Sequence, residues 1–153
     1  MSLCCDVIRL LQGKTLVTAE SCTGGGIGAA LTSVSGSSAV YKGGIISYTN
    51  WVKEHLLHVD ASDLERFGAV SAPVARAMAR GAKQSLEADI AVSVTGLAGP
   101  GGDEFGNSVG TVFIGYCDER NCFSREFHFS GDRESLRNQA IEAALSIILE
   151  QNQ

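Results

Sequence analysis

Residues 14–34 read KTLVTAESCTGGGIGAALTSV, and this stretch sets the expected fold. Its first part, 14–19, is mostly apolar and predicts a β-strand. The glycines that follow predict a tight turn, and a helix is expected from about Gly24 to Val34. A strand that turns through glycines into a helix is typical of α/β proteins.

Further strands are predicted where apolar and β-branched residues run together. They lie at 43–49, 88–95, 109–117 and 122–129. The run 88–95, ADIAVSVT, is apolar almost throughout, which is typical of a buried central strand. A short polar turn at 118–121 separates the last two strands, so we expect them to form a hairpin.

Helices are predicted on both sides of these strands. They lie at 4–12, 51–57, 60–67, 72–87 and from near Asp132 onward, with a loop at 35–38. Asn50 and Ser71 are expected N-caps, and Pro73 fits the first turn of its helix. The order of elements predicts an α/β fold, a three-layer α/β/α sandwich with a mixed, mostly parallel central sheet, in a single domain spanning 1–153.

Composition excludes several classes of protein. The chain has 153 residues, 44% hydrophobic and 19% charged, so it is too apolar for a disordered protein. The net charge of −5 argues against a nucleic-acid partner, because such domains usually carry a basic face. No segment approaches the ~20 consecutive apolar residues of a membrane span, and we expect no membrane partner.

The cysteines point to a compartment. There are five, an odd number, with no Cys-x-x-Cys, so neither a disulfide framework nor a zinc site is expected. The first 12 residues lack the order of a signal peptide. A reducing cytoplasm fits these observations best.

The glycine cluster has competing interpretations. Gly24-x-Gly26-x-x-Ala29 matches a relaxed dinucleotide fingerprint, but the second strand ends in SYTN, without the acidic residue that holds a ribose. No Gly-Lys-[Ser/Thr] of a P-loop is present. The glycines either allow tight packing of helix on sheet or leave a helix N-terminus with exposed amide donors, which suits an anion or an oxyanion.

Two side chains stand where those donors point. Cys22 is a candidate nucleophile because a helix N-terminus lowers the pKa of a thiol, yet no histidine lies in a cysteine-protease context. A small buried residue is the favoured interpretation of Cys22. Ser21 is either an N-cap or a nucleophile.

Lys53 is a candidate base for Ser21. If strands 14–19 and 43–49 are neighbours, their carboxyl ends share one crevice, and Tyr48 and Lys53 face Ser21. Lys53 falls in the first turn of its helix, where the helix dipole should lower the lysine pKa from about 10.4. Such a lysine can act as a base in a Ser-Lys hydrolase, with Tyr48 relaying a proton, although a solvated lysine is the simpler alternative.

The chain resembles the C-terminal domain of the competence/damage-inducible CinA proteins over roughly residues 14–150. The matching segments are TAESCTGGGIGAALTSVSGSSAVYKGGIISYTNWVKEHLL, GAVSAPVARAMARGA, VSVTGLAGPGG, VGTVFIGY and FSGDRESLRNQA. One departure is Asn107-Ser108, where the family usually has Lys-Pro. The large N-terminal domain of full-length CinA is absent, so the chain resembles a stand-alone member.

The resemblance implies an activity. Stand-alone members include nicotinamide-nucleotide amidohydrolases, which convert nicotinamide mononucleotide to nicotinic acid mononucleotide and ammonia. It implies Ser21 as nucleophile with Tyr48 and Lys53 as its catalytic partners, a pyridine-nucleotide substrate, no metal, no cofactor, and a homo-oligomer. The alternatives are a catalytically silent pyridine-nucleotide-binding module, a competence- or damage-related interaction module, and an NAD-dependent oxidoreductase.

Candidate substrate-binding residues come from three places. Backbone amides at Cys22, Thr23, Gly24 and Gly25 are expected to hold the oxyanion. The segment Thr95 to Gly102, with Thr95, Gly96 and Gly99, is either a backbone nest for the substrate phosphate or a plain loop. Arg133 is either the charged partner of that phosphate or a surface arginine.

Other polar side chains carry weaker signals. Asp103 and Glu104 are expected to be solvated, because a metal site would need more carboxylates nearby. His55 and His58 are spaced i, i+3 on one predicted helix and could chelate a metal weakly, although a solvated helix face is favoured.

Overall fold

A single five-stranded sheet organises the chain in the computed structural model, which describes residues 2–153. Its strands are β1 (Leu16–Glu20), β2 (Tyr41–Ile46), β3 (Ile90–Gly96), β4 (Thr111–Cys117) and β5 (Cys122–His128). They lie in the order β2-β1-β3-β4-β5. All five predicted strands are therefore confirmed, and none of their ends shifts by more than three residues.

The strand directions bring several strand ends and connections together at one edge of the sheet. β1 pairs in parallel with β2 and β3, β4 is antiparallel to β3, and β5 is antiparallel to β4. Only β4 is thus reversed, which confirms a mixed, mostly parallel sheet. The carboxyl ends of β1, β2 and β3 meet at one edge, and the β3–β4 connection begins and ends there too.

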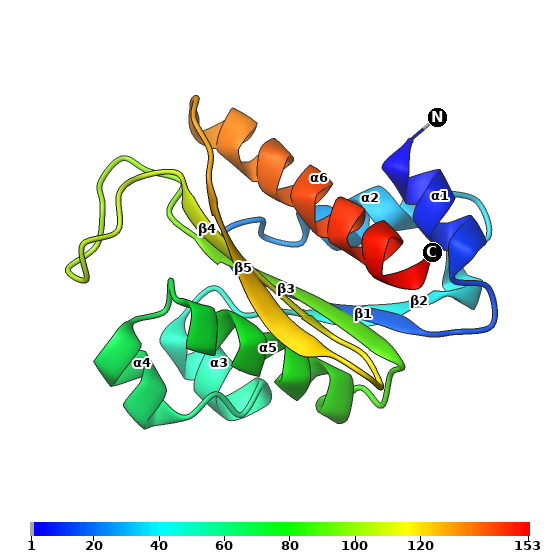
Figure 1. Ribbon diagram of the computed structural model, residues 1–153, viewed down its shortest axis with the longest axis horizontal. Helices are drawn as coiled ribbons and strands as arrows, with labels where there is room; N and C mark the ends of the chain where they lie inside the picture. The colour runs from blue at the N-terminus through cyan, green and yellow to red at the C-terminus, as the bar shows by residue number, and fades with distance from the viewer. Residues whose placement is uncertain (1) are drawn as a thin grey trace.

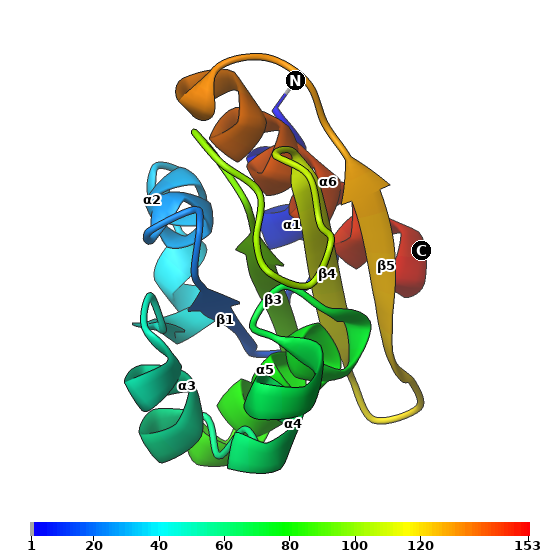
Figure 2. The ribbon, with the colours of Figure 1, turned by 90° about the vertical axis from the view of Figure 1, so that its left-hand side faces the viewer.

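Helices cover both faces of the sheet, as Figure 1 shows, so the α/β/α sandwich is confirmed. One face carries α1 (Leu3–Leu10), α2 (Gly26–Thr32) and α6 (Arg133–Asn152). The other carries α3 (Asn50–Leu56), α4 (Ala61–Phe67) and α5 (Ala72–Ser85). In the view turned by 90° the β1–α2 turn, the start of α3 and the β3–β4 loop lie around one end of the sheet (Figure 2).

Burial explains which strands are central. Residues of β1 and β4 are buried throughout, whereas β2 alternates between half-buried and exposed residues, as an edge strand does. One apolar core lies between the sheet and α1, α2 and α6, and a second lies between the sheet and α4 and α5. α5 packs closely because Gly115 has no side chain, and a Cβ there would meet Ala75 O.

Helix boundaries follow the sequence with small corrections. Ser71 stands at the N-cap position of α5 with Pro73 in the first turn, but its hydroxyl donates to Gly68 O instead of accepting from the helix. Thr49, not Asn50, is the N-cap of α3. The predicted loop 35–38 contains a short 3-10 helix, Ser37–Ala39. Along residues 2–153 no helix has the length and apolarity needed to span a bilayer.

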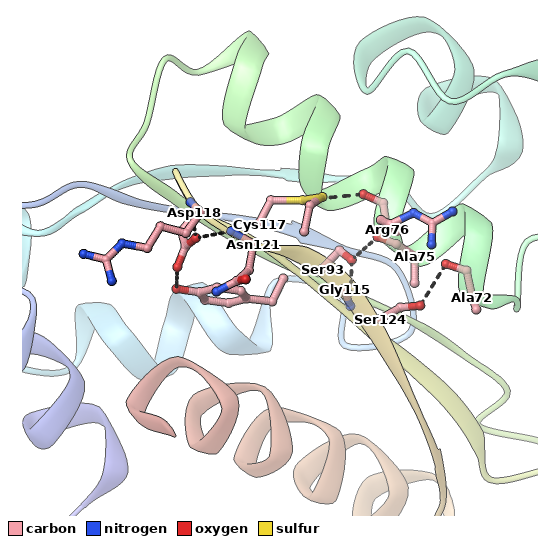
Figure 3. Close-up of a disulfide and its surroundings, with 12 residues drawn as sticks. Ala72, Ala75, Arg76, Ser93, Gly115, Cys117, Asp118, Asn121 and Ser124 are labelled. Atoms are coloured by element: carbon pink, nitrogen blue, oxygen red, sulfur yellow. Dashed lines mark hydrogen bonds between the residues drawn. A yellow bond between two sulfur atoms is a disulfide. The ribbon is translucent and has the colours of Figure 1, made fainter. Parts of the chain in front are cut away.

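The expectation for the cysteines is wrong for one pair. Cys117 and Cys122 stand opposite each other at the ends of β4 and β5 and form a disulfide, with Cα atoms 4.0 Å apart. Asp118 N donates to Asn121 O across the intervening turn (Figure 3). The hairpin register, which spacing rules do not consider, brings the two cysteines together. A reducing compartment therefore loses support from the cysteine count.

Candidate active site

Ser21 lies immediately beyond the carboxyl end of β1. Its amide still continues the sheet, donating to Val94 O of β3 at 3.0 Å, and its carbonyl accepts from Gly24 N at 3.0 Å. The serine is 8% exposed. The nucleophile predicted from the sequence is thus held by the backbone on both sides, at the start of a tight turn.

Lys53 contacts Ser21 where the carboxyl ends of β1 and β2 lie side by side. Its Nζ lies 3.2 Å from Ser21 Oγ and donates to Ser47 O at 2.6 Å. The Lys53 side chain is 1% exposed. It belongs to α3, a helix of seven residues. The structure therefore joins Ser21 and Lys53, which are 32 residues apart, as the neighbouring strands predicted.

The acid–base state of Lys53 suits a base. Burial, opposed only in part by the nearby Cys22, lowers the pKa of Lys53 to about 8. The predicted direction is confirmed, but its cause is corrected. Removal from water, rather than the helix dipole, is the main reason, because Lys53 lies four residues beyond the N-cap Thr49 in a short helix.

The surroundings of Cys22 disfavour the thiolate form that a cysteine nucleophile needs. Burial raises the pKa of its thiol to about 11, with the positive charges of Arg137 and Lys53 opposing this only in part. A thiol with that pKa carries almost no thiolate at pH 7. The side chain is partly buried against the core, as the packing interpretation predicted.

The α2 N-terminus does not offer its amides to a ligand. Glu20, 2% exposed, turns its carboxylate into this end of the helix and accepts from Ile27 N at 2.8 Å and Gly28 N at 3.0 Å. The expectation of exposed donors at the helix end is therefore wrong. An internal carboxylate occupies the position that an anion would take.

Amide donors remain in the turn before the helix. Within residues 2–153 no protein acceptor meets the amides of Cys22, Thr23 and Gly25, whereas Gly24 N donates to Ser21 O. Arg137 of α6 holds two carbonyls of this turn, donating to Cys22 O at 3.0 Å, in the same peptide as Thr23 N, and to Thr23 O at 2.9 Å, in the same peptide as Gly24 N. Three of the four predicted oxyanion donors are thus free, and Gly24 is not.

Tyr48 and Arg133 lie together at the rim. Tyr48 is 60% exposed and its hydroxyl accepts from Arg133 Nη2 at 3.3 Å, while Arg133 Nη1 donates to Gly99 O at 2.8 Å. Across the described chain no hydrogen bond joins Tyr48 to Ser21 or Lys53. The structure therefore links Tyr48 and Gly99 through Arg133, and Tyr48 is not hydrogen-bonded to the two groups that it was expected to assist.

The β3–β4 loop is closed by its own carboxylate. Asp103 accepts from Phe105 N, Asn107 N and Asn107 Nδ2, and Asn107 Nδ2 also donates to Val70 O. These bonds lower the pKa of Asp103 although its partial burial acts to raise it, so the expectation of a merely solvated Asp103 is wrong.

Only part of the predicted nest is available. Thr95 is buried and donates to Ala69 O, and Gly96 is the last residue of β3, so both serve the fold. The amides of Ala98, Gly99, Gly101 and Gly102 meet no protein acceptor in the described structure. A phosphate nest at 98–102 stays a prediction.

The possible metal site at His55 and His58 is not supported by the structure. His55 stacks on Trp51 with ring centroids 4.1 Å apart, and its Nδ1 lies 2.8 Å from Trp51 O. Among residues 2–153, no three His, Cys, Asp or Glu side chains gather in a way that could hold a metal ion.

Sequence reasoning missed Glu20 and Arg137. Glu20 ends an apolar strand directly before the glycine-rich turn, where a lone buried carboxylate must find donors, and that position is the signal. Arg137 lies in the last helix, 115 residues after its partner Cys22, and no local pattern connects them.

Comparison with known proteins identifies relatives of the whole fold. The family model described as CinA C-terminal domain matches residues 4–152. A CinA-like protein of Parasynechococcus marenigrum is 53% identical over 134 residues, 86% of this chain and 32% of that protein. One from Thermosynechococcus vestitus is 52% identical over 130 residues, 83% of this chain and 31% of that protein. The chain thus spans about a third of the length of these curated relatives.

Solved structures agree over nearly the full chain. A competence/damage inducible protein of Agrobacterium tumefaciens has a TM-score of 0.95 and 39% identity, covering 99% of this chain and 94% of that one. A competence-damaged protein superfamily member from Klebsiella pneumoniae has a TM-score of 0.94 and 34% identity, covering 97% of this chain and 94% of that one.

Proposed function

This chain belongs to the CinA C-terminal domain family, and from that premise we propose that it is a nicotinamide-nucleotide amidohydrolase. The reaction would hydrolyse the carboxamide of nicotinamide mononucleotide to the carboxylate and ammonia. The observation that carries the proposal is the contact of 3.2 Å between the buried Lys53 Nζ and Ser21 Oγ. A serine beside a lysine whose pKa is lowered to about 8 is the pairing that Ser-Lys acyl transfer requires.

The proposed first half of the reaction forms an acyl-enzyme. Neutral Lys53 takes the proton of Ser21 Oγ as that oxygen bonds to the carboxamide carbon. The amides of Cys22, Thr23 and Gly25 stabilise the negative oxygen of the tetrahedral intermediate. The C–N bond then breaks, and the proton on Lys53 passes to the leaving nitrogen, which departs as ammonia.

The second half returns the enzyme to its starting state. Lys53, neutral again, takes a proton from water as the water oxygen attacks the acyl carbon. The bond to Ser21 Oγ breaks, the proton returns to that oxygen, and nicotinic acid mononucleotide leaves. Neither half calls for a cofactor.

Substrate recognition is assigned to the rim. Arg133 and the amides near Gly99 supply donors for the phosphate, and the α2 N-terminus is unsuitable because Glu20 already fills it. Tyr48 keeps its proposed part in proton transfer, although its hydroxyl contacts Arg133 in the structure. Homo-oligomer formation and a cytoplasmic location also remain predictions, the first of which light scattering would test.

The direct test is release of ammonia from nicotinamide mononucleotide, measured for the wild type and for Ser21→Ala. We expect turnover by the wild type and a rate reduced by about 10³-fold or more in the variant. Ser85→Ala, which removes an exposed hydroxyl that donates to Leu56 O, is the matched control and should retain the wild-type rate. Near-normal turnover by Ser21→Ala would exclude the serine mechanism, and binding without turnover by the wild type would indicate a nucleotide-binding module.

A further inference from the structure

Glu20 is a buried charged residue that the proposed chemistry does not use. Its carboxylate collects four donors in an apolar surrounding. Oε1 accepts from Thr23 Oγ1 at 2.7 Å and Ile27 N at 2.8 Å, and Oε2 accepts from Gly28 N at 3.0 Å and Thr18 Oγ1 at 3.2 Å. Since an ionised carboxylate only accepts hydrogen bonds, this ring of donors matches its chemistry.

The main chain of Glu20 is linked to Lys53 through Ser47. Glu20 O accepts from Ser47 N at 2.8 Å, and Ser47 O in turn accepts from Lys53 Nζ at 2.6 Å. Glu20 also directly precedes Ser21. One residue therefore connects the end of β1, the glycine-rich turn, the start of α2 and the carbonyl that orients Lys53.

We propose that Glu20 is a positioning residue for the acyl-transfer site. Its carboxylate holds the 21–25 turn in the form that leaves the amides of Cys22, Thr23 and Gly25 available to an oxyanion. Glu20 acts through Thr23 and the first amides of α2 and does not touch the substrate. This inference rests on the proposed function, because the oxyanion belongs to that reaction.

The geometry requires a carboxylate of this length. Each oxygen accepts from one backbone N–H and one hydroxyl, so a glutamine would turn its NH₂ group against donors on one side. An aspartate is one methylene shorter and would lose contact with some of the donors. The carboxylate also opposes the binding of a phosphate at this end of α2, which directs the anionic part of a ligand toward Arg133.

The kinetic experiment compares Glu20→Gln, Thr23→Val and the double variant in the ammonia assay. We expect kcat to fall about 100-fold for Glu20→Gln and about tenfold for Thr23→Val, with KM changed less than about twofold, because oxyanion contacts form only in the transition state. The double variant should be no slower than Glu20→Gln, since Thr23 acts through the same carboxylate.

Tyr116→Phe is the matched control for lost stability. The Tyr116 side chain is fully buried in β4, and its hydroxyl contacts Asp118 Oδ2 at 2.8 Å and Asn152 Nδ2 at 3.1 Å at the opposite edge of the sheet. The variant should lower the midpoint of thermal unfolding yet keep kcat. A wild-type kcat in Glu20→Gln, strictly additive losses in the double variant, or an equal loss of kcat in Tyr116→Phe would each overturn the proposal.

A second measurement separates this proposal from the assigned reaction. Amide hydrogen exchange at Ile27 and Gly28 should accelerate at least tenfold in Glu20→Gln and stay unchanged in Tyr116→Phe. Failure of the wild type to release ammonia would refute the proposed function. Unchanged amide hydrogen exchange in Glu20→Gln would refute the proposal that the Glu20 carboxylate holds the turn in place. Faster exchange with a wild-type kcat would leave the function standing and reject the positioning role.

Discussion

Two glycine-rich segments meet at the same edge of the sheet, and they are held in different ways. The 21–25 turn is fixed by charged side chains from outside it, Glu20 and Arg137, and its Thr23 is fully buried. The 97–110 loop is exposed over most of its length and is closed mainly by its own Asp103. The 21–25 turn is therefore held by buried contacts of the kind found in a protein core. The 97–110 loop is held mainly by hydrogen bonds within itself, as surface loops are.

The proposed reaction assigns chemistry to the turn and recognition to the loop, and this difference fits that assignment. A catalytic turn must keep its donors in place, and a buried charged group with all its hydrogen bonds made provides that rigidity at a cost in desolvation. A recognition loop tolerates more motion, because binding contacts depend less steeply on position than transition-state contacts do. Each prediction below perturbs one of the two segments, or the Lys53 side chain that contacts Ser21 in the turn, and uses the other segment or a distant site as the reference.

Lys53→Met should have the largest effect on rate. Lys53 is the proposed proton acceptor for Ser21, and removing its amino group is expected to reduce kcat by about 10²- to 10⁴-fold. Lys42→Met is the control, because Lys42 is an exposed lysine whose Nζ donates to Glu87 O. Equal rates for the two variants in the ammonia assay would remove Lys53 from the mechanism.

The same variant should be more stable than the wild type at pH 7. A shift of the Lys53 pKa from 10.5 to about 8 corresponds to about 3 kcal/mol of burial cost, and the two lost hydrogen bonds offset about half of it. The cost is fully present below pH 8 and disappears as pH rises to 10.5, where the unfolded lysine is also neutral. Urea unfolding at pH 7 and pH 10 should therefore show a gain that shrinks with pH.

The pH dependence of the rate should follow Lys53 and not the loop. Since only neutral Lys53 accepts the serine proton, and burial holds its pKa in the free protein at about 8, kcat/KM should rise about 50-fold from pH 6 to pH 8. The pKa of Asp103 is lowered below its ordinary value of 3.8, so the loop keeps its carboxylate bonds over this range. Limited proteolysis of the loop should be equal at both pH values, and a flat kcat/KM profile would contradict the assignment.

Substituting glycine by alanine should have the smallest effect, and it compares the two segments directly. Gly25 has φ of +100°, and a Cβ there would lie 3.2 Å from Ile46 Cδ1. We expect Gly25→Ala to lower the free energy of unfolding by about 1–2 kcal/mol. Gly101 has open space around it, so Gly101→Ala should change the free energy of unfolding by less than about 0.5 kcal/mol. Equal thermal unfolding midpoints would show that the turn is not constrained as described.

Much of the fold could be predicted because hydrophobic patterns mark its strands. The apolar run at 88–95 predicted the buried β3, and the contact between Ser21 and Lys53 followed from placing their strands side by side. Glu20 escaped prediction because the donors for its carboxylate come from β1, the turn and the start of α2, and no periodicity encodes how these three segments meet. The same limit explains Arg137 and the Cys117–Cys122 disulfide, which depend on helix placement and hairpin register.

The reversal of β4 has a consequence for divergence among such proteins. Because β3 and β4 are antiparallel, the 97–110 loop leaves the sheet and returns to it at the edge that holds Ser21. Residues can be inserted or exchanged in 98–108 without changing the register of any strand or the bonds of Glu20. Within this loop, Asn107 Nδ2 donates to Val70 O at 3.0 Å. In the proposed reaction, this loop can therefore vary with the substrate while Ser21 and Lys53 stay as they are.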